Sequence, residues 1–294
     1  AAAGEKQKLI NYGVLGGIVM GITAAKLWER YHRISLPPYL AFFGGRRFVP
    51  IVTALAAIIL AVLLGVIYPA FNSGLTALGN WVVANTIIGG LVYGTLNRLL
   101  IPLGLHHILN SVPWFVFGEY TAADGQVYHG DIARFLHGDP AAGPFMTGFF
   151  PIMMFALPAA AFAIWRAAKP SQRKAVGGIM LSGALTSFLT GVTEPLEFSF
   201  MFVAWPLYVL HSVLTGTSLA VANALGIHDG FGFSAGLFDF ALNWNIATKP
   251  ALLIVLGLIY AVVYYVLFTW VIRKWNLRTP GREDDDSTTA DTSA

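Results

Sequence analysis

Long runs of apolar residues recur along the whole chain, and they limit the folds open to it more than any other feature. The clearest runs are residues 12–25, 49–68, 145–165, 196–214 and 251–272. A helix needs about 20 apolar residues to cross the hydrocarbon core of a bilayer. Only 11% of the residues are charged, against roughly 25% in soluble domains. The sequence therefore predicts an all-α, polytopic membrane protein.

Two stretches between these runs have a different texture. Residues 80–117 and 215–248 are also apolar, but Gly, Pro, Asn and His interrupt them. Irregular backbone at membrane depth is tolerated only where it is buried in protein or lines a cavity, as in re-entrant hairpins. We expect about five to seven membrane-crossing elements and one or two hairpins in a single membrane domain.

The basic residues indicate which ends of these elements face the cytoplasm. Thirteen of the 18 Lys and Arg residues lie in three short segments, around residues 26–47, 166–174 and 273–282. The positive-inside rule places such segments, and with them the C-terminus, on the cytoplasmic side. The lysine-free loop 118–144 then faces the other side or folds back into the protein. Nucleic acid is excluded as a partner, because the basic groups flank apolar spans and form no continuous stripe.

Two acids stand in an apolar environment in the segment GVTEPLEFSFMFVAW. Glu194 and Glu197 follow Gly191, and Pro195 lies between them, so a helix should break or end here. An acid at membrane depth is costly and indicates a functional site. Together with Thr193, these acids can exchange hydrogen bonds with sugar hydroxyls. The alternative is that both acids lie on a water-exposed loop between two spans.

A second polar group occurs in NRLLIPLGLHHILNSVPWF, which contains Arg98, His106, His107 and Asn110. If one helix continues past Pro102, Arg98 and His106 lie within about 80° of each other around its axis. Asn110 then lies one turn further along the same face. Such a line of side chains suits a ligand rich in hydroxyls and amides. The alternative is that Arg98 snorkels to an interface and the histidines cap a helix end.

The segment GIHDGFGFSAGLFDFALNWN holds further polar residues. His228 and Asp229 are predicted in a loop, whereas Asp239 and Asn243 are spaced one helical turn apart. For Asp239 the favoured interpretation is a structural partner of another polar group, although a secondary contact with a ligand stays open for His107, His228 and Asp239.

The segment LPPYLAFFGGRRFVPI combines aromatic residues with two basic ones. The aromatic residues Tyr39, Phe42 and Phe43 precede Arg46 and Arg47. This segment is typical of an amphipathic interfacial element that ends in a cytoplasmic turn. Simple anchoring of a span and docking of a partner at Arg46 and Arg47 are equally compatible with this pattern.

The sequence lacks the common enzymatic and metal-binding templates. It contains no cysteine, no Walker A motif and no HExxH. We therefore expect neither a metal nor a cofactor.

Several motifs together resemble the IIC membrane component of the bacterial sugar phosphotransferase system. They are FFGGRRFVPI, NRLLIPLGLHHILN, HGDIARFLHGD, FMTGFFPIMMFALPAAA, GVTEPLEFSFMF and RKWNLRTPGRED. Within the glucose superfamily of these permeases, the HGD…HGD loop and the FMTGFFPIMMF stretch look most like the N-acetylglucosamine-specific branch. The resemblance covers residues 9–283.

The resemblance implies the glucose-superfamily IIC fold with re-entrant hairpins, lacking some of the family's N-terminal helices. Residues 1–79 would be the remaining part of the scaffold and dimerisation half. Residues 80–276 would be the sugar-binding transport half, and residues 277–294 a disordered cytoplasmic tail or linker. The implied protein is a homodimer in the bacterial cytoplasmic (inner) membrane.

The resemblance also implies roles for individual residues. His106 and Glu194 match residues that hold sugar hydroxyls, and Glu194 is also placed to take the proton from the hydroxyl that is phosphorylated. Arg98 is a further expected sugar contact, followed by Asn110, Thr193 and Glu197.

The implied partners are N-acetylglucosamine and a phosphorylated IIB domain or protein, on which any sugar phosphorylation depends. A glucose-specific IIC is the first alternative. An ion-coupled secondary transporter and an intramembrane enzyme that uses His106 and Glu194 are the others.

Overall fold

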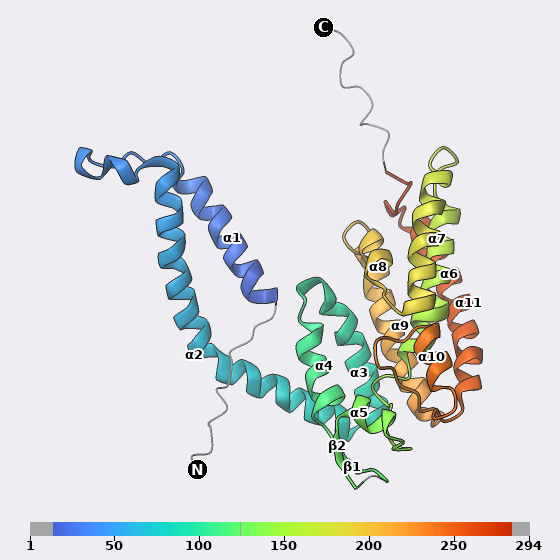
Figure 1. The fold of residues 1–294 in the computed structure, drawn as a ribbon. Coiled ribbons are helices and arrows are strands. Elements are labelled where there is room, and N and C mark those ends of the chain that lie inside the picture. Colours follow the sequence, from blue (N-terminus) through green and yellow to red (C-terminus); the bar gives the residue numbers. More distant parts are fainter. Residues whose placement is uncertain (1–13, 124, 284–294) are drawn as a thin grey trace, which may run out of the picture. The chain divides into compact units, whose positions relative to one another are not determined.

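The computed structural model describes residues 14–123 and 125–283, and almost all regular structure in this part of the chain is helical (Figure 1). The helices are α1 (Val14–Tyr31), α2 (Phe48–Ala84), α3 (Thr86–Leu99), α4 (His106–Phe115), α5 (Asp131–Leu136), α6 (Leu157–Ala167), α7 (Arg173–Thr190), α8 (Glu194–Met201), α9 (Trp205–Ala224), α10 (Leu237–Asn243) and α11 (Pro250–Lys274). Strands β1 (Glu119–Thr121) and β2 (Val127–His129) form an antiparallel hairpin in which Glu119 lies opposite His129. The prediction of an all-α membrane protein is confirmed.

The chain divides into two compact units. The first comprises residues 1–79 and 100–109, and the second comprises residues 80–99 and 110–294. In the first unit, two short 3₁₀ helices, Pro38–Phe43 and Gly45–Arg47, connect α1 to α2. The second unit contains most of the buried core.

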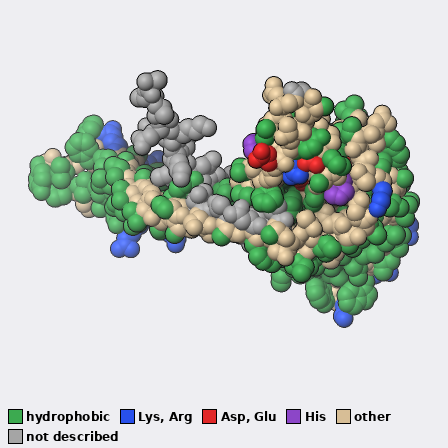
Figure 2. All heavy atoms as spheres, turned by 90° about the horizontal axis from the view of Figure 1, so that it is seen from below, with side chains coloured by type: hydrophobic (Ala, Val, Ile, Leu, Met, Phe, Trp, Pro, Cys, Tyr) green, Lys and Arg blue, Asp and Glu red, His purple; other side chains and the backbone are tan. Residues whose placement is uncertain are grey.

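Three helical segments of the described chain are long and apolar enough to cross a membrane. They are Gly45–Phe71, Trp205–Ala224 and Pro250–Lys274, and Pro151–Ala167 is a shorter apolar helix. The most apolar stretch of Gly45–Phe71 has no buried residue. In Figure 2, hydrophobic side chains cover much of the visible surface, whereas acidic side chains gather in one small area. Such extensive apolar exposure is what a lipid-facing surface requires.

Small residues bring the helices of the second unit close together. A Cβ atom added to Gly94 on α3 would lie 2.9 Å from Cα of Gly216 on α9. A Cβ atom on Gly257 of α11 would lie 2.2 Å from the ring of Phe155. Close backbone approach at small residues is a common way for helices to associate without a hydrophobic driving force from water. These contacts hold α3 against α9, which matters for the site described below.

The predicted break at residues 191–195 is confirmed. Helix α7 ends at Thr190, Gly191 adopts a left-handed conformation with φ of 73°, and α8 begins at Glu194 with Pro195 in its first turn. Glycine reaches this conformation without the steric cost that a Cβ atom imposes.

One expectation about a continuous helix was wrong. The apolar run 196–214 is not one span, because α8 ends at Met201 and α9 begins only at Trp205. Ala204 between them is non-helical, with φ of −140° and ψ of 54°, and Pro206 in the first turn of α9 has no N–H to continue a helix from α8. Helix α9 then runs on to Ala224, so the irregular stretch begins about ten residues later than expected.

The helix that begins at Thr86 also fails to continue past Pro102. Helix α3 ends at Leu99, and Gly104 turns the chain in a left-handed conformation with φ of 64° before α4 starts at His106. Arg98 therefore does not share one helix face with His106 and Asn110.

The loop 118–144 folds back into the second unit. Asp131 at the start of α5 is 3% exposed, and its carboxylate accepts hydrogen bonds from the backbone N–H groups of Gly143 (2.8 Å) and Phe145 (3.0 Å). Burial raises the pKa of Asp131 to about 6. Arg134 and Asp139 form an ion pair of 2.6 Å in the same loop.

Residues 277–283, predicted as the start of a disordered tail, are bonded to the second unit. Thr279 is fully buried, the backbone N–H of Lys169 donates to the carbonyl of Gly281 (2.9 Å), and Arg282 donates to the carbonyl of Ala167 (3.2 Å). These bonds tie residues 277–283 to the α6–α7 connection. The rest of the predicted tail lies outside the described residues.

Candidate functional site

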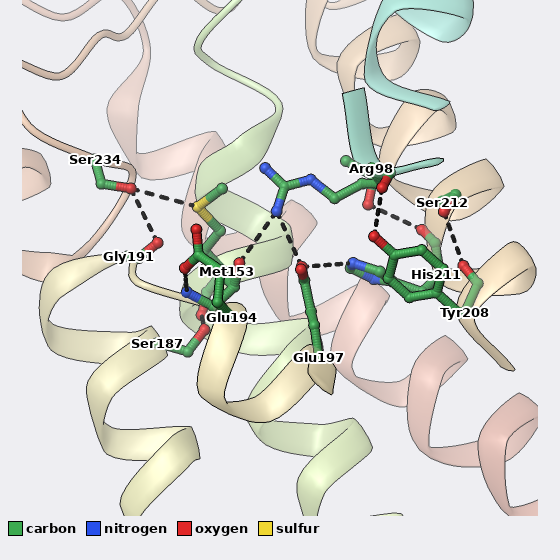
Figure 3. Close-up of polar contacts among 12 residues, drawn as sticks. Arg98, Met153, Ser187, Gly191, Glu194, Glu197, Tyr208, His211, Ser212 and Ser234 are labelled. Carbon is green, nitrogen blue, oxygen red and sulfur yellow. Dashed lines mark hydrogen bonds and ion pairs between the residues drawn. The ribbon is translucent and has the colours of Figure 1, made fainter. Parts of the chain in front are cut away.

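The two acids of the broken-helix segment occupy the first turn of α8. In Figure 3, the side chains of Glu194 and Glu197 rise from this turn in the same direction. Glu197 is fully buried, whereas Glu194 is half-buried and accepts a hydrogen bond from the backbone N–H of Thr193 (3.1 Å). A helix N-terminus favours negative charge, which helps to stabilise both acids here. Burial of Glu197 in protein contradicts the alternative of a water-exposed loop for that residue.

Arg98 reaches these acids from the last turn of α3. Its Nη1 atom lies 3.0 Å from Oε1 of Glu197 and 3.1 Å from Oγ1 of Thr193. The guanidinium also lies over the ring of Phe149, 5.0 Å from its centre. Arg98 is 6% exposed, so the alternative that it snorkels to an interface is wrong. The structure thus brings together Arg98, Thr193 and Glu197, and Glu194 adjoins them on α8.

Three further residues of this network were missed by the sequence analysis. His211 on α9 lies with Nε2 3.0 Å from Oε1 of Glu197, and the hydroxyl of Tyr264 on α11 lies 2.9 Å from Nδ1 of His211. Tyr208 donates its hydroxyl proton to the backbone carbonyl of Arg98. His211 lies in an apolar helix that is long enough to cross a membrane. An ionisable residue inside such a helix indicates a functional site, and this signal could have identified His211.

Asn110 is buried and holds α4 against α3 within the second unit. Its Oδ1 accepts hydrogen bonds from the Tyr93 hydroxyl (2.7 Å) and the Asn97 amide (2.6 Å). This oxygen is therefore already engaged with protein groups.

His106 and His107 open α4 within the first unit, with ring centres 3.9 Å apart. The role predicted for His106 beside Glu194 stays a prediction.

The remaining predicted residues contact mainly backbone groups of the protein. Nδ1 of His228 lies 3.1 Å from the carbonyl oxygen of Ala142. The carboxylate of Asp239 accepts backbone hydrogen bonds from Gly232 (2.8 Å) and Ser234 (3.2 Å). These bonds agree with the structural interpretation of Asp239.

Beside His228, Asp229 is fully buried, and burial raises its pKa to about 7. Arg46 and Arg47 are exposed at the turn before α2, and Arg47 lies 4.7 Å from the ring centre of Phe42. Among the residues that the structure describes, no group of three or more His, Cys, Asp or Glu side chains is arranged to hold a metal ion.

The chemistry of the Arg98–Thr193–Glu194 arrangement suits a neutral, hydroxyl-rich ligand. A guanidinium donates hydrogen bonds in a fixed planar pattern, a carboxylate accepts them, and a hydroxyl does both. Glu194 is the acid of the pair that retains partial exposure, so it is the one that a ligand can reach.

The sequence of this chain matches a known family and several known proteins. Residues 5–216 match the family model described as "Phosphotransferase system, EIIC". The chain is 54% identical over 274 residues to the PTS system N-acetylglucosamine-specific EIIC component of Streptomyces coelicolor, an alignment that covers 93% of this chain and 66% of that protein.

Two other relatives carry similar names. The chain is 52% identical over 286 residues to the PTS system N-acetylglucosamine-specific EIICB component of Bacillus subtilis, covering 97% of this chain and 62% of that protein. It is 52% identical over 280 residues to the EIICBA component of the same specificity from Escherichia coli, covering 94% and 43%. The chain therefore spans between 43% and 66% of the length of these relatives.

Proposed function

This chain belongs to the phosphotransferase system EIIC family, and from that premise we propose that it forms the sugar-binding part of a permease for N-acetylglucosamine. The observation that carries the proposal is the cluster of Arg98, Thr193, Glu194 and Glu197, which lies within the matched residues. Three relatives above 50% identity are named for this sugar, which favours it over glucose.

In the proposed mechanism, the sugar binds beside α8 and is presented to a phosphorylated IIB domain or protein. The sugar hydroxyl attacks phosphorus, the phosphorus–sulfur bond of the IIB phosphocysteine breaks, and the cysteine leaves as a thiolate. Glu194 accepts the hydroxyl proton as general base. His106, Arg98 and Thr193 are proposed to hold sugar hydroxyls, and Asn110 completes the polar lining. Phosphoryl transfer therefore requires IIB.

The proposed setting is a homodimer that crosses the bacterial inner membrane several times, with its C-terminus in the cytoplasm. The clustering of basic residues at 26–47, 166–174 and 273–282 supports this orientation through the positive-inside rule. Exposed apolar side chains along Gly45–Phe71 support contact with lipid.

Binding of N-acetylglucosamine and glucose to the purified full-length protein tests the proposal. We expect N-acetylglucosamine to bind at least about tenfold more tightly, because a site that hydrogen-bonds a substrate group discriminates against analogues that lack it. Equal affinities would favour a glucose-specific permease. Binding of neither sugar would favour an intramembrane enzyme, and accumulation of unmodified sugar in the presence of IIB would favour an ion-coupled transporter.

Arg46 and Arg47 are proposed to attract the phosphorylated partner. Changing both to Ala should slow phosphorylation of bound sugar by IIB roughly tenfold, because exposed charges mainly raise the rate of encounter, and sugar affinity should stay within about twofold. Rates measured at several salt concentrations should converge at high salt. The matched control changes Arg30 and Arg33, which are exposed in the same unit. An equal loss of phosphorylation rate in the control would mean that the effect comes from the overall positive charge of the unit and not from docking at Arg46 and Arg47.

A further inference from the structure

A hydrogen-bonded network of buried side chains runs from Arg98 through Glu197 to His211 (Figure 3). It continues from His211 to Tyr264. We propose that His211 and Tyr264 are positioning residues, which orient Arg98 for sugar binding by fixing the carboxylate of Glu197. The inference rests on the proposed function for its ligand. It departs from the sequence-based expectation for Glu197, since that residue would act on the sugar only through Arg98.

The first step concerns what Glu197 can reach. Glu197 is fully buried, and its Oε1 is shared by Nη1 of Arg98 and Nε2 of His211, each at 3.0 Å. A buried carboxylate needs both a compensating charge and hydrogen-bond donors. Arg98 supplies the charge, and His211 supplies a second donor from the α9 side. Oε1 of this carboxylate is thus held between α3 and α9.

The second step concerns the protonation of the imidazole. An ionised carboxylate only accepts hydrogen bonds, so Nε2 of His211 must carry the proton that it shares with Glu197. In the neutral ring, Nδ1 is then an acceptor and requires a donor. The Tyr264 hydroxyl lies 2.9 Å from Nδ1 and 3.2 Å from the carbonyl oxygen of His211, and both are acceptors for its single proton. Given to Nδ1 over the shorter of the two distances, that proton satisfies the ring. Tyr264 therefore selects the tautomer that can donate to Glu197.

The third step concerns Arg98 itself. Its guanidinium is held by Glu197 and Thr193 and lies over Phe149, and its backbone carbonyl accepts a hydrogen bond from Tyr208. The restraints come from several helices, so the long side chain has little freedom left. Binding groups that are fixed before the ligand arrives lose less entropy when it binds. Removing the Tyr264 hydroxyl, at the far end of this network, should therefore weaken sugar binding without removing a contact to the sugar.

Tyr264→Phe tests the proposal with a matched control on the same helix. Tyr260 lies one turn earlier on α11, and its hydroxyl donates to Oγ1 of Thr217 on α9 (2.9 Å). Each substitution removes one hydroxyl from the packing of α11 on α9, and Tm is measured for both variants because Tyr264 contacts two atoms of His211 whereas Tyr260 contacts one atom of Thr217. We expect Tyr264→Phe to weaken N-acetylglucosamine binding roughly tenfold, because a guanidinium that is less well fixed loses more entropy when the sugar binds. Tyr260→Phe should stay within about twofold of wild type. Equal affinities in the two variants would overturn the proposal.

A double-mutant cycle asks whether Tyr264 acts through Arg98. In an Arg98→Lys background, the fixed planar guanidinium is absent, so adding Tyr264→Phe should cause little further loss of affinity. Full additivity of the two changes would contradict the proposed route.

A measurement without sugar separates this inference from the proposed function. The order of the Arg98 guanidinium can be followed by solid-state NMR on ¹⁵N-arginine-labelled protein, with Arg98→Lys used for assignment. Order should fall in Tyr264→Phe and be unchanged in Tyr260→Phe. Unchanged order in both variants would overturn the positioning role, whereas failure of wild type to bind any sugar would overturn only the proposed function.

Discussion

Replacing Glu194 by Gln should leave much of the sugar affinity intact and lower the rate of sugar phosphorylation by about 100-fold or more, the usual contribution of a general base. The amide keeps the size and one oxygen of the carboxylate, so the hydrogen bond from the Thr193 amide can persist. It cannot accept the hydroxyl proton at neutral pH. The two measurements are equilibrium binding of N-acetylglucosamine and single-turnover phosphorylation by phosphorylated IIB.

Glu119→Gln is the matched control, because Glu119 is an exposed acid on β1. This variant should behave as wild type in both measurements. Normal phosphorylation by the Glu194 variant would exclude the base role, and a parallel loss of binding and phosphorylation would assign Glu194 to binding alone.

Arg98→Leu should have the largest effect on stability. It leaves the fully buried carboxylate of Glu197 without its cation, and removing one partner of a buried ion pair costs about 3–5 kcal/mol. We also expect loss of measurable sugar binding, because the variant removes a guanidinium from the proposed site. Thermal unfolding in detergent and equilibrium binding measure the two effects.

The double variant Arg98→Leu/Glu197→Leu separates these two effects. Replacing both members of a buried pair by apolar residues is often neutral for stability, so the double variant should recover part of the Tm lost by the single one. The rest stays lost because Nε2 of the buried His211 no longer has its acceptor. It should not recover sugar binding. Recovery of binding along with stability would show that Arg98 is not a sugar contact, and no loss of Tm in the single variant would contradict the burial argument.

The predictions that held depend on residues close together in the chain. Gly191 and Pro195 act on their own backbone, so the helix break that exposes the N-terminal turn of α8 could be foreseen. The shared helix face of Arg98, His106 and Asn110 was conditional on a helix that continues past Pro102, and that condition is not met. Gly104, in a left-handed conformation, reverses the chain there.

The pairing within the site could not be foreseen in the same way. Arg98 and Glu197 are 99 positions apart. Neither segment contains a local pattern that predicts which acid pairs with the guanidinium. In the sequence, His211 and Tyr264 are polar residues within apolar helices. Their contact depends on how α9 and α11 pack against each other.

The sequence by itself determined that the protein lies in a membrane, that it is helical and that a helix breaks at residues 191–195. Apolar content acts through the bilayer, and glycine and proline act on the local backbone. Only the tertiary structure decided which acid is buried and which remains reachable. Close packing of α3 on α9 at Gly94 and Gly216 brings Arg98 to Glu197 and leaves Glu194 half-buried. A charge inside a protein is stable only beside its partner, and helix packing sets which partner that is.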